Sequence, residues 1–139
     1  MNFLGTNIQM VFDSFFVKIP TVDFTGKESL VFQLFKSSIP YCYKTVPEDL
    51  TYTFDETLYE GTFDNILGQD TIELIALCMK REYYRREVDK YASTKQYIGT
   101  QAFNKLPNMK ELSDCARVNL KDISDTFEAF RQEFYTYKN

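Results

Sequence analysis

The sequence predicts a mainly all-α fold, and three observations point to this class. Apolar residues recur at helical spacing over several long segments, and only residues 50–60 show a pattern typical of a short β-hairpin. The length of 139 residues suits one domain, 1–139, and is sufficient to bury a core without disulfides or metals. With 44% hydrophobic and 26% charged residues, the composition is that of a globular chain and excludes a disordered one.

The first predicted helix covers residues 7–19, and Pro20 ends it because the residue before a proline avoids the helical region. Its apolar residues form one stripe at spacings of three and four, namely Ile8, Val11, Phe12, Phe15, Phe16 and Ile19. A second helix is expected to begin after Thr25, with Glu28 completing a capping box. Pro40 should kink or end this helix because proline lacks the backbone donor.

Residues 45–69 are expected to form an extended acidic loop, punctuated by Pro47, Gly61 and Gly68. Within it, residues 51–54 and 57–59 pair as a short hairpin around the acidic dipeptide 55–56, or else remain an extended loop. The pattern leaves both alternatives open.

The third predicted helix covers residues 71–92, with Asp70 as N-cap and Glu73 at the reciprocal position of a capping box. Residues 72–79 are apolar on nearly every side, which is typical of a helix buried among others. Beyond them the helix becomes basic and aromatic, and residues 93–105 read as a linker that contains Gly99.

The last predicted helix is long and begins after Asn108, with Glu111 three residues later, and runs to about residue 135. Its apolar residues follow a nearly heptad spacing: Met109, Leu112, Ala116, Leu120, Ile123, Phe127, Phe130 and Phe134. We prefer the interpretation that this seam packs against the helix that begins at Thr71, and self-association along the seam is the alternative.

The absence of histidine excludes several classes of site. Neither a Ser-His-Asp triad nor an imidazole metal site can form. The three cysteines, Cys42, Cys78 and Cys115, are too far apart for a CxxC motif, and their odd number disfavours a secreted disulfide framework. We expect Cys78 and Cys115 to be small buried hydrophobic residues in a reducing compartment. No phosphate-binding motif, signal peptide or membrane-length apolar run is present, so we expect no cofactor, no metal, no membrane contact and no enzyme activity.

Charge is distributed unevenly along the chain. Residues 1–75 carry 4 Lys/Arg and 11 Asp/Glu, a net charge of −7, whereas residues 76–139 carry 12 and 9, a net charge of +3. Most of the acidity lies in residues 44–75, which hold one lysine and eight acids. The two halves either meet head to tail between copies of the chain or form separate solvated faces.

Two groups of side chains are candidate binding residues. Residues 80–95 hold six basic and three acidic residues interleaved with tyrosines, a composition compatible with a solvated face, a protein interface or a nucleic-acid surface. The interface candidates in this segment are Tyr83, Tyr84, Arg85, Arg86 and Tyr91. The acidic candidates are Glu48, Asp49, Asp55, Glu56 and Glu60, which we interpret as a solvated loop rather than a Mg²⁺ or Ca²⁺ site.

The order of these segments resembles that of head–tail connector proteins of tailed bacteriophages, also called neck or adaptor proteins. The similarity lies in the helix that closes with residues 16–19 before Asp23-Phe24, and in a helix with Ser37-Ser38 and a Cys42-Tyr43 end. It continues with Phe63 and Leu67 ahead of the segment DTIELIALCMKREY at residues 70–83, which is similar to the family's central helix, and with the aromatic end at residues 134–137.

The resemblance implies a four-helix connector-type bundle that is repeated in a ring, typically of twelve copies, in the virion at the head–tail interface, after synthesis in the host cytoplasm. Such a ring docks under the portal protein, extends the DNA channel and receives stopper or tail proteins, and DNA passes through without sequence-specific binding. The acidic candidates would then line the lumen or face a neighbouring copy, and the basic-aromatic segment would contact the acidic loop of the next copy.

The C-terminal segment 134–139 would be a docking tail in the same scheme. Phe134, Tyr135 and Tyr137 would anchor it in the portal or in a neighbouring subunit. The alternative function is that of a small helical phage protein that binds and inhibits a host factor. A carboxylate–metal nuclease is a third, less favoured hypothesis.

Overall fold

The computed structural model describes residues 5–138, and their side chains as far as Phe134. Within this range the chain forms five helices and one two-stranded antiparallel sheet, in the order α1 (Gln9–Lys18), α2 (Glu28–Cys42), β1 (Tyr52–Asp55), β2 (Glu60–Phe63), α3 (Gln69–Ile98), α4 (Thr100–Lys105) and α5 (Met109–Lys138). The expectation of a mainly helical fold with a long last helix and a hairpin is therefore confirmed.

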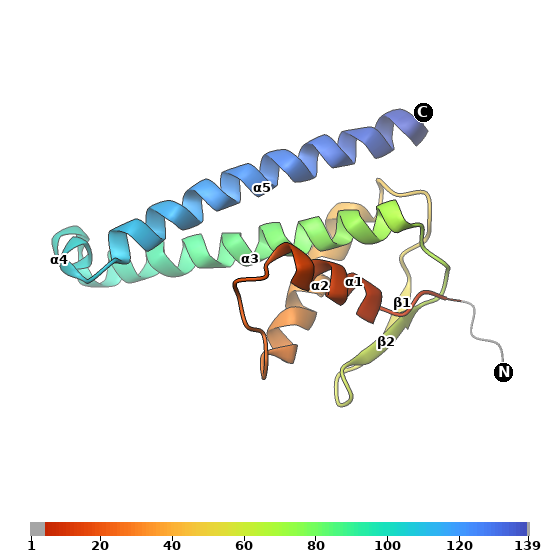
Figure 1. Cartoon of the computed structure of the whole chain (residues 1–139), viewed down its shortest axis with the longest axis horizontal. Helices are drawn as coiled ribbons and strands as arrows, with labels where there is room; N and C mark the ends of the chain where they lie inside the picture. Colours follow the sequence, from red (N-terminus) through yellow and green to blue (C-terminus); the bar gives the residue numbers. More distant parts are fainter. Residues whose placement is uncertain (1–4, 139) are drawn as a thin grey trace.

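Helix α3 is the centre of the molecule. Figure 1 shows α5 antiparallel to α3 along one side, while α1 and α2 pack against the first half of α3 on the other side. The apolar segment at residues 72–79 lies in this first half, and Leu74, Ile75 and Met79 are fully buried, as predicted. The second half of α3 runs beyond α1 and α2 beside α5 and forms a two-helix arm that ends at α4.

The first two helices differ from the prediction at their ends. Helix α1 ends before Pro20 as predicted, but α2 begins at Glu28 and no capping box forms. Instead the carboxylate of Asp23 accepts the backbone N–H of Thr25 at 2.9 Å, and Gly26 has a φ of 76°. Pro40 does not end α2, which continues two residues beyond it to Cys42, and the N–H of the C-cap residue Tyr43 still donates to the Ile39 carbonyl at 2.9 Å.

Residues 45–69 contain a hairpin, so the alternative of a wholly extended loop is wrong. Tyr52 pairs with Phe63 and Asp55 with Glu60. The second strand lies three residues later than predicted because the Asp55 carboxylate accepts N–H groups of Thr57 (2.8 Å) and Leu58 (3.2 Å). These two bonds hold residues 56–59 in a turn.

The start and the end of α3 also required correction. Asp70 and Glu73 do not form a capping box, since the helix begins at Gln69 with Gly68 as its N-cap and Glu73 binds residues of α1. The predicted linker at residues 93–105 is helical, because no helix breaker occurs before Gly99. Gly99, with a φ of 91°, separates α3 from α4.

Helix α5 begins at Met109 as predicted, and its apolar seam packs on α3. Ala116, Ile123 and Phe127 are buried, which supports packing over self-association as the main role of the seam. The predicted apolar seam does not describe the first two turns of α5, because Leu112 is exposed there and Ser113 is buried instead.

Candidate functional site

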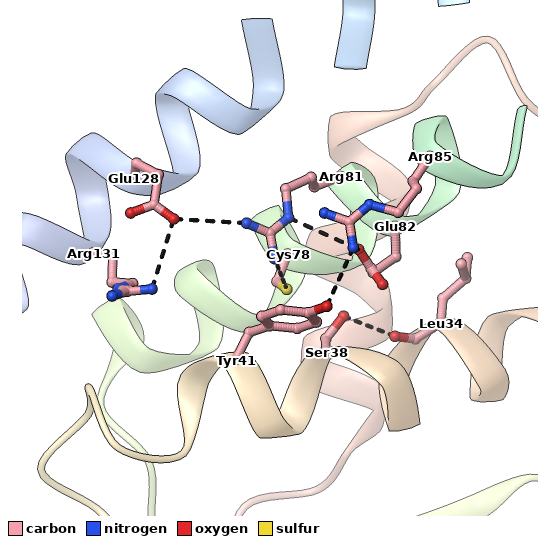
Figure 2. A network of polar contacts seen from close by, with 9 residues as sticks. All are labelled: Leu34, Ser38, Tyr41, Cys78, Arg81, Glu82, Arg85, Glu128 and Arg131. Carbon is pink, nitrogen blue, oxygen red and sulfur yellow. Dashed lines mark hydrogen bonds and ion pairs between the residues drawn. The ribbon is translucent and has the colours of Figure 1, made fainter. Parts of the chain in front are cut away.

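A cluster of charged residues connects three helices and forms the most extensive polar network among the described residues. Figure 2 shows Tyr41 of α2, then Arg81, Glu82 and Arg85 of α3, and finally Glu128 and Arg131 of α5. We call this group the arginine cluster. Residues far apart in the sequence build it, so no local motif indicates it.

Arg81 lies at the centre of the arginine cluster and is only 5% exposed. Its guanidinium carbon lies 4.6 Å from the centre of the Tyr41 ring and 4.1 Å from that of Phe127. Its nitrogens lie 3.8 Å and 3.9 Å from the carboxylates of Glu128 and Glu82, distances longer than those of hydrogen-bonded ion pairs. The Nε atom has no hydrogen-bond acceptor within the described part of the chain. Another guanidinium nitrogen donates a hydrogen bond to the Cys78 thiol at 3.6 Å. Two aromatic rings, one thiol and two more distant carboxylates therefore surround this buried cation.

The predicted interface arginines, Arg85 and Arg86, make contacts within their own chain. Arg85 lies 2.9 Å from the carboxylate of Glu82 and donates to the hydroxyl of Tyr41 at 3.2 Å. Burial opposes the charge of Arg85, but these two contacts outweigh it and raise its pKa. Arg86 donates to Gln33 at 3.4 Å. These two arginines of α3 therefore bind residues of α2 in the same chain, which connects the two helices.

The predicted interface tyrosines are half-buried. The Tyr83 ring packs edge-on against Phe24 at 5.7 Å and against Tyr84 at 5.4 Å. Burial, followed by interaction with Glu87, raises the pKa of the Tyr83 hydroxyl. Tyr91 lies under the ammonium group of Lys90 at 5.3 Å. These side chains contribute to intramolecular packing and leave part of their surface exposed.

The predicted anchor at the end of α5 is only partly described. Phe134 is half-buried and its ring lies 5.6 Å from that of Phe130, against the core. The side chains of Tyr135 and Tyr137 lie outside the described residues.

The acidic candidates do not converge on one site. Glu48 binds the start of α3, where its carboxylate accepts the N–H of Gly68 at 2.5 Å and the hydroxyl of Thr71 at 2.7 Å. Asp49 accepts the N–H and hydroxyl of Thr51, which together lower its pKa. Asp55 holds the hairpin turn, while Glu56 and Glu60 are exposed beside it. Asp49 and Asp55 are therefore local structural groups, and Glu48 attaches the preceding loop to the N-terminal end of α3 from twenty residues away.

Neither a metal site nor a reactive cysteine motif is found in the part that the structure describes. No group of three or more metal-ligating side chains comes together there. Cys42 and Cys78 are buried, and the neighbouring thiol of Cys78 together with burial raises the pKa of Cys42. Cys115 is exposed, so the prediction that it is buried was wrong. On α5 the next residue, Ala116, faces the core and is buried, so Cys115 lies beside the buried face of the helix and not on it.

A cluster of lysines that sequence reasoning missed lies at the end of the two-helix arm. Residues 90–110 contain Lys90, Lys95, Lys105 and Lys110 and no acidic residue. They form the end of α3, all of α4 and the start of α5. A search of the sequence for acid-free segments would have found this cluster.

Comparison with known proteins does not assign the chain to a family. No family model, no curated protein and no solved structure matches it. Within residues 5–138, no helix has the length and apolar character needed to cross a membrane.

Proposed function

We propose that this chain is a structural subunit of a phage virion, a head–tail connector that assembles into a ring between the portal and the tail. The observation that carries the proposal is the separation of charge on an elongated helical subunit. The hairpin turn, whose residues 55–60 include three acids and no lysine or arginine, projects from one half of the molecule (Figure 1). Residues 95–110, which include three lysines and no acid, form the tip of the arm in the other half. Such a subunit offers opposite charges to neighbours on two different sides, which suits repeated head-to-tail contacts.

Acidic groups on the ring would also suit a DNA channel. Glu56 and Glu60 are exposed, and the chain has a net charge of −4. A negatively charged lumen repels phosphates, so DNA would slide through without being retained. The portal and the stopper or tail proteins would be the partners above and below the ring.

The test is recovery of the tagged full-length chain from the cells that produce it, followed by mass spectrometry and measurement of stoichiometry. Recovery of a portal or tail protein with many copies of this chain would support the connector proposal. Recovery of one host protein in a one-to-one complex would overturn it in favour of the inhibitor of a host factor.

A second test addresses the C-terminal anchor. Deletion of residues 134–139 is expected to leave a folded chain that no longer joins the complex. Because Phe134 packs against Phe130, the double substitution Tyr135→Ser, Tyr137→Ser keeps this core contact and serves as the matched variant. If both variants still assemble with the portal, the anchor proposal fails.

A further inference from the structure

The end of the two-helix arm is an exposed surface that combines lysines with apolar side chains. We call residues 95–110 the basic tip. Tyr97 is 91% exposed, and Ile98 and Leu106 are 37% and 38% exposed. Phe103 of α4 is buried beneath the tip, which gives this surface a small core of its own. Exposed apolar groups gathered among charges of one sign are typical of a protein-binding surface.

Two of the three lysines of the basic tip are more available than the arginines of α3, whereas Lys95 lies 5.9 Å from the centre of the Phe103 ring. Arg81, Arg85 and Arg86 all contact residues of their own chain. Lys105 and Lys110, in contrast, have exposed side chains. The basic tip is therefore the stronger candidate for an intermolecular contact than the segment 80–91.

The hairpin turn is the complementary surface. We call residues 55–60 the acidic turn. It holds Asp55, Glu56 and Glu60 without a basic residue, and Leu58 is 63% exposed. The two hydrogen bonds from the backbone to Asp55 fix its shape before any partner binds. A preformed turn loses little conformational freedom on binding.

We infer that the basic tip of one copy binds the acidic turn of the next copy. Lysines would meet Glu56 and Glu60, and the exposed Leu58 would meet the apolar groups of the tip. The arm points away from the hairpin of its own chain, so the two surfaces cannot satisfy each other within one molecule (Figure 1). A contact between two different surfaces propagates from copy to copy and closes into a ring when the rotation permits. The inference rests on the proposed ring and specifies its interface.

A second copy fits the basic tip better than nucleic acid does. Four lysines over residues 90–110 give a small positive charge, and the whole chain carries −4. The negative remainder of the molecule would repel phosphates from the tip. The acidic turn presents carboxylates with an apolar residue, which nucleic acid lacks.

Charge reversal tests the contact in the purified full-length chain by analytical ultracentrifugation at about 50 mM salt, where screening is weak. The wild type should self-associate at high protein concentration. The tip variant Lys105→Glu, Lys110→Glu and the turn variant Glu56→Lys, Glu60→Lys should each sediment as monomers. An equimolar mixture of the two variants should associate again, because each provides the surface that the other has lost. The matched control Lys27→Glu, Lys44→Glu changes the net charge as the tip variant does, at two exposed lysines elsewhere, and should behave as the wild type.

Several outcomes would overturn the inference: a monomeric wild type, tip and turn variants that still associate, or a mixture that stays monomeric. If the wild type binds a DNA duplex and the tip variant does not, while self-association is unchanged, the tip binds nucleic acid instead.

The two proposals fail separately. Charge-dependent self-association without recovery of a portal or tail protein would refute the connector proposal alone. A virion ring built from the tip variant alone, or from the turn variant alone, would refute this interface alone.

Discussion

The guanidinium carbon of Arg81 lies 4.1 Å from the centre of the Phe127 ring, which places a buried cation of α3 against a buried ring of α5. The ring of Tyr41 in α2 lies near the same guanidinium, with its centre 4.6 Å from the guanidinium carbon. Aromatic faces attract cations, and the attraction grows when the groups are desolvated. Arg81 therefore connects α2, α3 and α5 through these two rings, while its nitrogens lie near the Cys78 thiol and two carboxylates.

The first prediction is that the shape of Arg81 matters more to stability than its charge. Arg81→Met fills most of the same space, and Glu82 keeps its contact with Arg85 at 2.9 Å. We expect this variant to unfold with a free energy within about 1 kcal/mol of the wild type, or higher, as for other buried ions replaced by apolar residues. Arg81→Ala leaves a cavity and should lose about 2 kcal/mol or more. Urea denaturation measures both, and equal losses in the two variants would show that the charge itself is required.

The second prediction concerns the two hydrogen bonds that attach Glu48 to the start of α3. Glu48→Ala removes the acceptor of the Gly68 N–H and of the Thr71 hydroxyl. The free energy of unfolding should fall by about 1 kcal/mol or more, the usual effect of losing hydrogen bonds to a charged group. Glu56→Ala, which removes an exposed glutamate of the same region, is the matched control and should change stability little. The idea fails if the two variants are equally stable in chemical denaturation.

The third prediction is a pH-dependent contribution from Lys18 and Glu73, which join α1 to α3. Burial opposes ionisation of Glu73, but its contacts with Lys18 and Ser14 outweigh burial and lower its pKa. Because the folded pKa lies below the unfolded one, the pair stabilises the fold above the unfolded pKa of about 4.3. This stabilisation disappears as the pH falls through the folded pKa.

Lys18→Met should therefore lower the free energy of unfolding by about 0.5–1 kcal/mol at neutral pH, as expected for a half-exposed pair. The difference from the wild type should vanish in acid. Lys44→Met, at an exposed lysine, is the control. Urea titrations at a series of pH values provide the measurement, and a difference that persists in acid would contradict the assignment to Glu73.

The fourth prediction concerns the attachment of the hairpin to the helices. The rings of Phe54 and Phe32 stack with centroids 3.9 Å apart and an interplanar angle of 8°. Phe54→Ala should cost about 2–3 kcal/mol because it removes a large packed ring. Amide hydrogen exchange should accelerate most in residues 52–63. Thr53→Ala, on the opposite face of β1, is the control, and uniform exchange rates in both variants would show that the stack does not hold the hairpin.

Local patterns were sufficient where one segment determines its own conformation. The apolar stripe of α1, the buried first half of α3 and the seam of α5 were predicted because helical spacing is visible within a few turns. The hairpin was predicted as one of two alternatives, but its register depended on which backbone groups Asp55 binds. The capping box expected at Asp70 was wrong because Asp70 lies inside α3, and Glu73, its expected partner, binds Lys18 and Ser14 of α1 instead.

The sequence by itself determined the mainly helical class, the approximate position of most elements and the opposite charges of the two halves. Only the tertiary structure decided which charged groups remain available. It brings Arg81 next to the rings of Tyr41 and Phe127 and pairs Arg85 and Arg86 with residues of the same chain. It leaves Lys105 and Lys110 exposed at the tip of the arm. The physical reason is that the partner of a charged side chain depends on which helices pack together, and helix packing brings together residues that are far apart in the sequence.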